Sequence, residues 1–459
     1  MVKIGVVATA PDLTSIWNRH HLADRLSFLR PLPALRQAAQ DLRARGADVV
    51  LALAHMGFGR LDDGAQPQNE LSSVSAIPEI DAVVGGHTHQ RFPDRIESVA
   101  THGSMARGLI HGTPVVQPGA SGSDLGQIDL TLTKTHTTDR WNISSASSEL
   151  ITTQPDTPED PGILNIVRAA HDQTCAYLNR PAARLADPMN TFFALAQPSP
   201  VQGLLAAAKR SVIQKTIAGT ELENLPLLAA ASATLTGGLD GPGNFIALQN
   251  GELKRRHIAG MNPYANQVWA VRTTGARLLD WLERSAVIFN TLSYETPRQM
   301  LINADIPGFR YDALFGLTYE IDPREAPRFD AGGHVIPDRK GRVSEVQWQN
   351  RPLDVNQEFL VAITDHRAGG GGIYQAFDND DIVLQGHCPL QSAVLEYLKN
   401  PSCEDVRTAK PWRLKTDMGV SAILLSAPEA ESCFDDVSAF APQNCGLTES
   451  GFLRVLLHL

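Results

Sequence analysis

The sequence predicts an α/β protein whose first third holds a buried parallel sheet, followed by a larger unit of mixed α and β structure. Two continuous apolar runs, 48–55 and 79–87, have the length of a strand, and each ends in a histidine. Strands that are apolar on both faces are typical of parallel sheets covered on both sides. A helical pattern precedes the first run, and this order of strand and helix indicates an α/β layer.

The elements follow in chain order. Residues 3–8 predict a short buried strand. Residues 32–45 predict an amphipathic helix, because Leu35, Ala39 and Leu42 recur at helical spacing and Gly46 ends the pattern. Beyond the two apolar runs we expect the following strands and helices: strands 113–116, 126–132, 317–321, 358–363, 421–425 and 452–457, and helices 162–179 and 274–289.

Composition supports several domains. The chain has 459 residues, 43% hydrophobic and 20% charged, which suits a globular protein of more than one domain. We expect an α/β domain at 1–150, a proline-rich linker and bridging helix at 151–184, a mixed α and β domain at 185–415, and a tail packed on it at 416–459.

Charge and cysteine content exclude some functions. A net charge of −10 argues against binding of a nucleic acid polymer. No apolar run is long enough to span a membrane, and the N-terminus does not resemble a signal peptide. The five cysteines fit no zinc template, although Cys433 and Cys445 could pair in an exported protein.

Three histidines form the strongest candidate site. His55 follows one predicted strand, and the segment Gly85-Gly86-His87-Thr88-His89 follows another. Ligands gather at the carboxyl ends of strands in such sheets, and glycines allow close approach of the backbone. Imidazoles are common metal ligands. The alternative is that each histidine is a hydrogen-bonded loop residue.

The motifs that contain these histidines resemble the last two metal-binding blocks of calcineurin-like metallophosphoesterases. They are most similar to those of the bifunctional 2′,3′-cyclic-nucleotide 2′-phosphodiesterase/3′-nucleotidases of the 5′-nucleotidase family. The resemblance implies a partial metallophosphoesterase α/β sandwich. It also implies that His55, His87 and His89 bind a pair of divalent metal ions, whether Zn, Mn, Co or Mg.

The family's earlier blocks, which supply a bridging aspartate and an acid histidine, have no counterpart before His55. We therefore expect an N-terminally truncated relative with an incomplete metal site. No catalytic residue can be assigned with certainty. The chain is expected to have little or no activity by itself.

The second half resembles the 5′-nucleotidase C-terminal α+β domain. The similarity lies in the segments 262–285, 308–322, 326–330 and 364–372. It implies a nucleoside site in which a base stacks on Tyr311 and on His366, each stacked ring contributing roughly 1–3 kcal/mol. Arg367, Gly370 and Gly371 would form a substrate loop. The alternatives are that Tyr311 is a packing residue and that the glycines form a surface turn.

One loop departs from the family pattern. Leu235 and Leu239 stand where relatives carry a lysine and an arginine around Gly237-Gly238, and Asp240 adds a negative charge. Losing two cations removes charge-assisted contacts to a phosphate. We therefore expect weaker substrate binding than in those relatives.

The resemblance implies a metal-dependent nucleotide phosphoester hydrolase in nucleotide catabolism, acting on 2′,3′-cyclic nucleotides and 3′-nucleotides. The alternative is a non-catalytic protein that binds nucleotides or nucleosides. A third possibility is a poorly folded product, because the strand at 3–8 would present a bare edge. We expect a monomer that binds neither nucleic acid polymers nor membranes, and a periplasmic location as in the family, although the chain shows no export signal.

Overall fold

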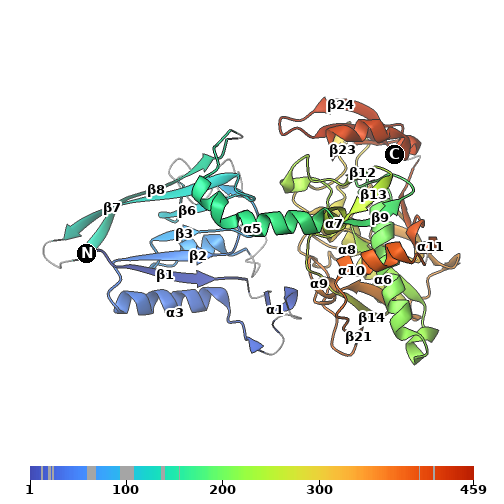
Figure 1. Ribbon diagram of the computed structural model, residues 1–459, viewed down its shortest axis with the longest axis horizontal. Helices are drawn as coiled ribbons and strands as arrows, with labels where there is room; N and C mark the ends of the chain where they lie inside the picture. Colours follow the sequence, from blue (N-terminus) through green and yellow to red (C-terminus); the bar gives the residue numbers. More distant parts are fainter. Residues whose placement is uncertain are drawn as a thin grey trace. The chain divides into compact units, whose positions relative to one another are not determined.

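The computed structural model divides into two compact units, Met1–Asn165 and Ile166–Leu459 (Figure 1). Each unit is described by itself. The structure describes residues 1–11, 14–18, 22, 25–58, 69–93, 108–135, 140–154, 156–402, 404–416 and 419–459.

The first unit contains the predicted parallel sheet. Its strands lie in the order β1-β2-β3-β6-β4, with β5 also paired to β6. Strands β1, β2, β3 and β6 run parallel, whereas β4 and β5 are antiparallel to β6. The bounds are β1 Ile4–Thr9, β2 Val49–Ala54, β3 Ala82–Val84, β4 Arg91–Phe92, β5 Leu109–Ile110 and β6 Thr113–Pro118.

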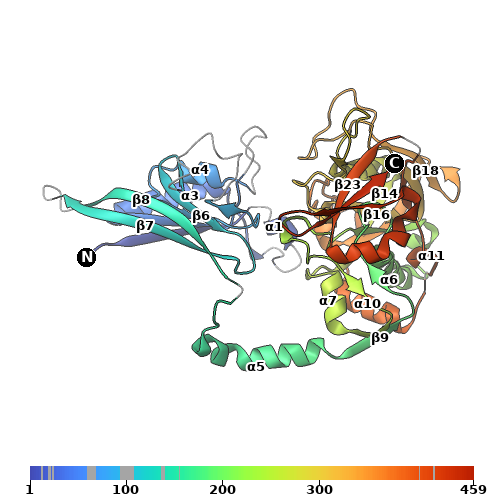
Figure 2. The ribbon, with the colours of Figure 1, turned by 90° about the horizontal axis from the view of Figure 1, so that it is seen from above.

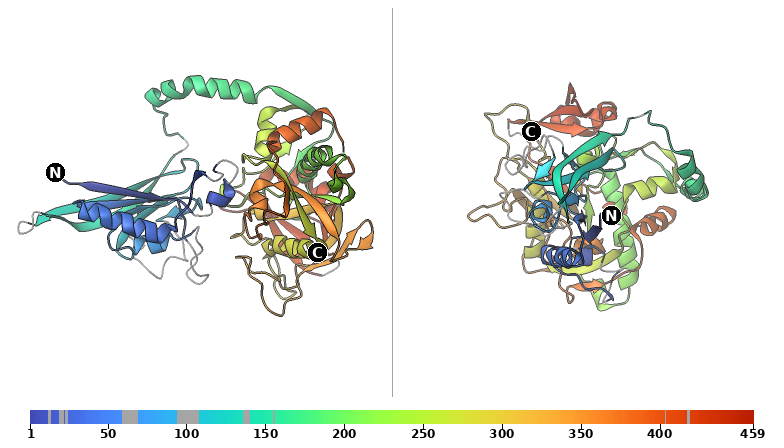
Figure 3. Two further views of the ribbon diagram at one scale, coloured as in Figure 1. Left: turned by 90° about the horizontal axis from the view of Figure 1, so that it is seen from below. Right: turned by 90° about the vertical axis from the view of Figure 1, so that its left-hand side faces the viewer.

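Helix α3 (Pro31–Ala44) covers one face of this sheet and lies along β1 in Figures 1 and 3. It begins with a proline, which suits the first turn of a helix, and Gly46 follows its end with a φ of +87°. Leu35 and Ala39 are buried in a core shared with α4 (Leu71–Ser75). The predicted amphipathic helix is confirmed. A short helix, α1 (Thr14–Trp17), precedes α3.

A long hairpin of β7 (Asp124–Thr135) and β8 (Arg140–Thr152) packs against β6 (Figure 2). Neighbouring residues of β6 point to opposite faces, as a strand requires. Val115 joins the core under α3, whereas Val116 lies where a side chain on Gly126 would contact it. The described part of this unit is thus a sheet with helices on one side and a hairpin on the other.

The helix expected at 162–179 is present as α5 (Pro161–Leu178, Figure 2). None of its residues is buried. Its C-terminal end is tied to the second unit, where Tyr177 Oη accepts a 2.8 Å hydrogen bond from Arg255. In the part of the chain that the structure describes, no helix has the length and apolar character needed to cross a membrane.

The second unit is built on a mixed nine-stranded sheet. Its order is β19-β18-β17-β16-β11-β20-β14-β21, and β22 also pairs with β17. The predicted strands 317–321 and 358–363 are both present. The bounds are β11 Leu227–Ser232, β14 Val268–Thr274, β16 Asp312–Phe315, β17 Leu317–Ile321, β18 Val343–Trp348, β19 Arg351–Pro352, β20 Glu358–Thr364, β21 Ile382–Leu384 and β22 Trp412–Leu414.

Helix α6 (Pro200–Ile217) is the central covering helix of this sheet and packs against β11. It starts with a capping box, in which Ser199 and Gln202 satisfy each other's backbone amides. Other elements around the sheet are helices α7 Arg255–Met261, α8 Gly275–Ser285, α9 Asp365–Ala368, α10 Leu390–Lys399 and α11 Glu404–Arg407, and strands β9 Pro181–Leu185, β10 Met189–Asn190, β12 Ala247–Leu248 and β13 Gly251–Lys254.

The C-terminal residues form a small sheet that belongs to the second unit. Strands β23 (Ser421–Ser426), β24 (Gln443–Leu447) and β25 (Leu453–His458) pair with one another and with β15 (Gln299–Met300). Their apolar residues join the core of the second unit. The thiols of Cys433 and Cys445 are free, so the pairing considered from the sequence is not present.

Two helical glycines test this packing. A Cβ on Gly203 of α6 would lie 2.2 Å from the carbonyl oxygen of Arg407, whereas a Cβ on Gly260 of α7 would meet nothing within 4 Å. We expect Gly203→Ala to lower the free energy of unfolding by about 1–3 kcal/mol because of this overlap. Gly260→Ala, its matched control, should raise it by up to about 1 kcal/mol. Urea denaturation measures both, and a stabilised Gly203→Ala variant would contradict the packing described for α6.

Candidate functional site

The first candidate site lies where two neighbouring parallel strands end. Strands β2 and β3 pair in register, with Leu53 opposite Val84. Their ends therefore meet at one edge, and the imidazoles of His55 and His87 lie there with ring centroids 5.3 Å apart. Backbone hydrogen bonds fix both segments, since His55 N donates to Thr9 O and Gly86 N donates to Met56 O, each at 3.0 Å.

Glycines allow the two segments to approach each other. A Cβ on Gly86 would lie 3.4 Å from Nδ1 of His55, and a Cβ on Gly57 would overlap the side chain of Thr88. Thr88 is itself held by buried Gln117, whose Nε2 donates to Thr88 Oγ1 at 2.7 Å. A larger residue at either glycine would push the histidine segments apart.

His87 and His89 have an unusual backbone conformation. Their φ angles are +71° and +59°, in the left-handed region that side chains rarely adopt. Such a conformation costs on the order of 1–3 kcal/mol and is concentrated at functional sites. The structure keeps it at two histidines of one short motif, which favours a functional role over a surface turn.

The electrostatics keep His87 in the form that binds metals. Burial lowers the pKa of His87 below its usual value, and the neighbouring His55 and His89 lower it further. A neutral imidazole retains the lone pair that a metal needs. The three predicted ligands therefore influence one another.

The fit to a metal is partial. In the described segments, no group of three or more His, Cys, Asp or Glu side chains is arranged to hold one ion. His55 and His87 are close together, whereas His89 does not complete such a group with them. The donors have the right chemistry for a divalent metal, but they do not form a full ligand set.

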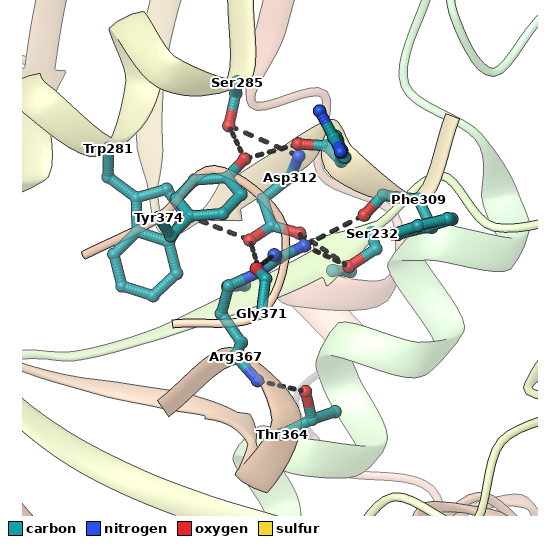
Figure 4. Close-up of polar contacts among 12 residues, drawn as sticks. Ser232, Trp281, Ser285, Phe309, Asp312, Thr364, Arg367, Gly371 and Tyr374 are labelled. Carbon is teal, nitrogen blue, oxygen red and sulfur yellow. Dashed lines mark hydrogen bonds and ion pairs between the residues drawn. The ribbon is translucent and has the colours of Figure 1, made fainter. Parts of the chain in front are cut away.

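The second candidate site surrounds Arg367 in the second unit (Figure 4). Arg367 lies on the short helix α9, whose first turn is capped by Thr364. The guanidinium is buried and pairs with both oxygens of Asp312, at 2.7 Å from Nε to Oδ2 and 3.0 Å from Nη2 to Oδ1. It also donates to the carbonyl oxygens of Phe309 and Gly371 and lies over the ring of Tyr374.

These contacts describe what Arg367 does within the chain itself, and direct binding of substrate by Arg367 stays a prediction. Its donors are already used by Asp312 and by backbone carbonyls, so little hydrogen-bonding capacity remains for a ligand. Its observed role is to hold the glycine-rich loop through Gly371 and the segment before β16 through Phe309. Arg367 is therefore a buried residue that keeps the glycine-rich loop and the segment before β16 in place.

Asp312 is the acidic centre of this cluster. Besides Arg367, its carboxylate accepts hydrogen bonds from Ser232 Oγ at 2.6 Å and Trp281 Nε1 at 3.0 Å. Lys209 lies close enough to Asp312 for the carboxylate charge to affect its pKa. Burial lowers the pKa of Lys209 to about 8, an effect that Asp312 opposes and Arg367 reinforces.

Tyr311 does not form an open wall for a base. It has no exposed surface, and its ring packs edge-on against Phe289 and Trp412, with centroids 5.7 and 5.2 Å away. Burial raises the pKa of its hydroxyl well above the usual value. The structure therefore agrees with the packing alternative, and a base could reach this ring only if Phe289 or Trp412 moved.

His366 and Gly370 are partly exposed, whereas Gly371 is buried beneath the His366 ring. His366 is partly exposed, and a Cβ on Gly371 would lie 2.1 Å from its Nε2, so this ring requires a glycine there. Gly370 has a φ of +85°, which favours glycine. Burial, reinforced by the nearby Arg367, lowers the pKa of His366 to about 4, so the ring is neutral at pH 7.

Tyr264 is an exposed aromatic residue that the sequence pattern did not single out. Its ring is 53% exposed. Its segment is joined to α9, because Gln267 N donates to Asp365 Oδ1 at 2.9 Å and Asp365 N donates to Gln267 O at 3.1 Å. A signal is present in the sequence, since Tyr264 lies within the segment 262–285 that carries part of the resemblance.

Comparison with known proteins agrees with both units. Residues 184–379 match the 5′-nucleotidase C-terminal domain family. The trifunctional nucleotide phosphoesterase protein YfkN of Bacillus subtilis is 26% identical over 444 residues, which cover 95% of this chain and 30% of that protein. The 2′,3′-cyclic-nucleotide 2′-phosphodiesterase/3′-nucleotidase of Salmonella typhimurium is 29% identical over 382 residues, covering 81% of this chain and 58% of that protein. The chain thus spans less than two thirds of the length of either relative.

Solved structures share the fold. A Staphylococcus aureus protein assigned as a 5′-nucleotidase superposes with a TM-score of 0.65 at 19% identity, covering 90% of this chain and 72% of that one. A 5′-nucleotidase precursor from Thermus thermophilus gives a TM-score of 0.53 at 17% identity, with the same coverage. The predicted fold class, a metallophosphoesterase-type α/β unit followed by a 5′-nucleotidase C-terminal domain, is confirmed.

The buried ion pair gives a stability prediction. Asp312→Asn would leave Arg367 buried without a counter-charge, which typically costs about 3–5 kcal/mol. Arg413→Gln is the control, because that arginine is 68% exposed in its pair with Glu320 and such pairs contribute about 0–1 kcal/mol. Urea unfolding compares the two variants. Equal losses of the free energy of unfolding in the two variants would show that the buried pair contributes no more to stability than the exposed one.

The neutral state of His366 gives a pH prediction. Its pKa is about 4 in the folded chain and near 6.5 when unfolded, so the unfolded state binds more protons between these values. Stability should therefore fall as the pH drops from 6.5 toward 4. Thermal melts of His366→Gln should show a smaller loss over this range, whereas His387→Gln, at an exposed histidine, should behave like the wild type. An unchanged pH profile in His366→Gln would refute the assigned environment.

Proposed function

Because this chain belongs to the 5′-nucleotidase family, we propose that it is a metal-dependent hydrolase of nucleotide phosphoesters. The relatives named above indicate 2′,3′-cyclic nucleotides and 3′-nucleotides as substrates. The observation that carries the proposal is the His55–His87 pair at adjoining strand ends. It supports a metal site of the kind that phosphoester hydrolysis requires.

In this proposal His55, His87 and His89 bind divalent metal, whether Zn, Mn, Co or Mg. When bound, such ions polarise a phosphate and activate water for attack on phosphorus. The chain's own contribution is to keep His87 neutral and to hold the histidine segments in place. The lowered pKa of His87 and the backbone hydrogen bonds of both segments support this role.

The second unit would bind the nucleoside. Two rings of this unit could stack on a base, each with a gain of roughly 1–3 kcal/mol. They are His366, against the glycine-rich loop, and the exposed Tyr264, whose segment is hydrogen-bonded to α9 through Gln267. Gly370 and Gly371 would shape the loop that holds the His366 ring, since a side chain at either position would overlap neighbouring atoms. Tyr311 and Arg367 would support these residues from the core. A periplasmic location and a monomeric state, both taken from the resemblance, belong to the same proposal.

A second candidate function is nucleotide or nucleoside binding without turnover. It is favoured by the incomplete metal-ligand set in the described residues. The two candidates differ in one measurable respect. Binding that persists in the presence of a chelator, without hydrolysis under any metal, would identify the non-catalytic protein.

Hydrolysis assays test the proposed activity. With Mn²⁺, Co²⁺ or Zn²⁺, the proposed activity predicts release of phosphate from adenosine 3′-phosphate and opening of adenosine 2′,3′-cyclic phosphate. Turnover should be well below that of a full-length relative, because the ligand set is incomplete in the described residues. His87→Ala should reduce kcat/KM by roughly a hundredfold or more, since loss even of a supporting group costs 10–100-fold. His334→Ala, at an exposed histidine, should have no effect. Metal-independent turnover, or full activity in His87→Ala, would refute the proposed site.

A further inference from the structure

Arg310 differs from the other arginine of the Arg367 cluster. It ends the short 3-10 helix Gly308–Arg310, and its backbone oxygen accepts a 2.6 Å hydrogen bond from Tyr374 Oη. Its guanidinium makes one weak hydrogen bond, from Nη1 to Ala331 O at 3.3 Å. Its Nε is buried without a partner, and no ion pair to Arg310 is found among the described residues. Arg310 is therefore an unsatisfied cation.

The surrounding charges do not neutralise it. Arg367 lies near Arg310 and adds positive charge, and the counter-charge of Arg367, Asp312, is engaged by Arg367 itself. Lys209 is a further cation close to Asp312 and Arg367. The Arg310 side chain is partly exposed, but its Nε is buried, and a buried polar atom without a hydrogen-bond partner is costly. An anion beside Arg310 would supply that missing partner.

The backbone next to Arg310 is bare. A Cβ on Gly372 would lie 3.5 Å from Cγ of Arg310 and 2.9 Å from Nη1 of Arg367. Gly372 is exposed and has a φ of +86°. The preceding residue, Gly371, lies against the ring of His366. The loop therefore separates the accessible ring of His366 from the side chain of Arg310, and no side chain of its own covers it.

We propose that Arg310 and the loop Gly370–Gly372 form a binding subsite for a phosphate group. The proposal rests on the proposed function, because a nucleoside held at His366 would bring such a group to the loop. A guanidinium can bind phosphate through two parallel hydrogen bonds, and glycine lets a ligand approach the backbone. The phosphate comes either from the bound nucleotide or from free inorganic phosphate.

The subsite would give the chain a specificity that stacking alone lacks. Stacking recognises the flat face of a base and tolerates any substituent on the ribose. A cation at a fixed position beside the ring would select ligands that carry a phosphate within its reach. Because Arg367 is already neutralised by Asp312, the selection depends on Arg310.

Calorimetric titration of the full chain in the presence of a chelator tests the proposal. The ligands are adenosine, adenosine 3′-phosphate, adenosine 5′-phosphate and inorganic phosphate. We expect at least one phosphorylated nucleoside to bind about tenfold or more tightly than adenosine, which corresponds to one charge-assisted hydrogen bond. Arg310→Gln should remove this gain and leave adenosine affinity unchanged. Arg339→Gln, at an exposed arginine, should keep the gain.

Two results would overturn the proposal: no gain from phosphate in the wild type, or a gain that survives in Arg310→Gln. Thermal melts show whether Arg310→Gln is folded, and Arg310→Lys should retain part of the gain through its charge. If inorganic phosphate alone raises the melting temperature of the wild type and not of Arg310→Gln, the site takes free phosphate.

The same titrations separate this proposal from the proposed function. If adenosine fails to bind, the nucleoside site is wrong, while the phosphate titration still decides the role of Arg310. Tyr264→Ala should weaken adenosine and leave inorganic phosphate binding unchanged. A variant that weakened both equally would show that phosphate does not bind at a separate subsite.

Discussion

The buried ion pair between Arg367 and Asp312 is the interaction on which the second unit's candidate site depends. One guanidinium joins β16 through Asp312, the preceding turn through Phe309, and the glycine-rich loop through Gly371 (Figure 4). The glycine-rich loop is about sixty residues from the other two segments in sequence, and no other single side chain described in the cluster contacts all three. The positions of His366 and of the bare loop follow from this pair, because Gly371 is held on one side by Arg367 and meets the His366 ring on the other.

A buried pair of this kind is not chosen for stability alone. Apolar residues of similar volume often stabilise a core as well as an ion pair does. The pair also fixes the relative positions of the segments around it, because the donors of a guanidinium are rigidly arranged and hold several acceptors at set angles. The same charges also affect their neighbours. Arg367 lowers the pKa of His366 and of Lys209, so the site contains a neutral ring beside an excess of positive charge.

The strands, the amphipathic helix and the histidine pair could be predicted from the sequence for physical reasons. Apolar runs and helical periodicity indicate which residues are buried. The observed bounds of α3 and β17 agree closely with the ranges 32–45 and 317–321 predicted in this way. The ends of neighbouring parallel strands must meet, so the two apolar runs alone are enough to place His55 and His87 together. These inferences rest on local pattern and on the geometry of one sheet.

The burial of individual motif residues in the core could not be predicted in the same way. Tyr311 and Arg367 occur in motifs that suggest a ligand site, yet both are buried, because Phe289, Trp412 and Asp312 come from distant parts of the chain. Tyr264 was missed for the converse reason. Its exposure depends on how its loop is joined to α9, which no local pattern reveals.

The two units use one structural device at their candidate sites. In the first unit, His55 follows the last residue of β2, and His87 follows a glycine turn after β3. In the second, Thr364 ends β20 and caps α9, so His366 and Arg367 follow within three residues of the strand. A strand that is hydrogen-bonded on both sides fixes the position of its last residue. The residues that follow directly are therefore also held in a defined position, although they lie near the surface. This explains why the chain can keep a costly left-handed backbone conformation at His87 and His89. The neighbouring sheet supplies the rigidity that would otherwise have to come from the ligand.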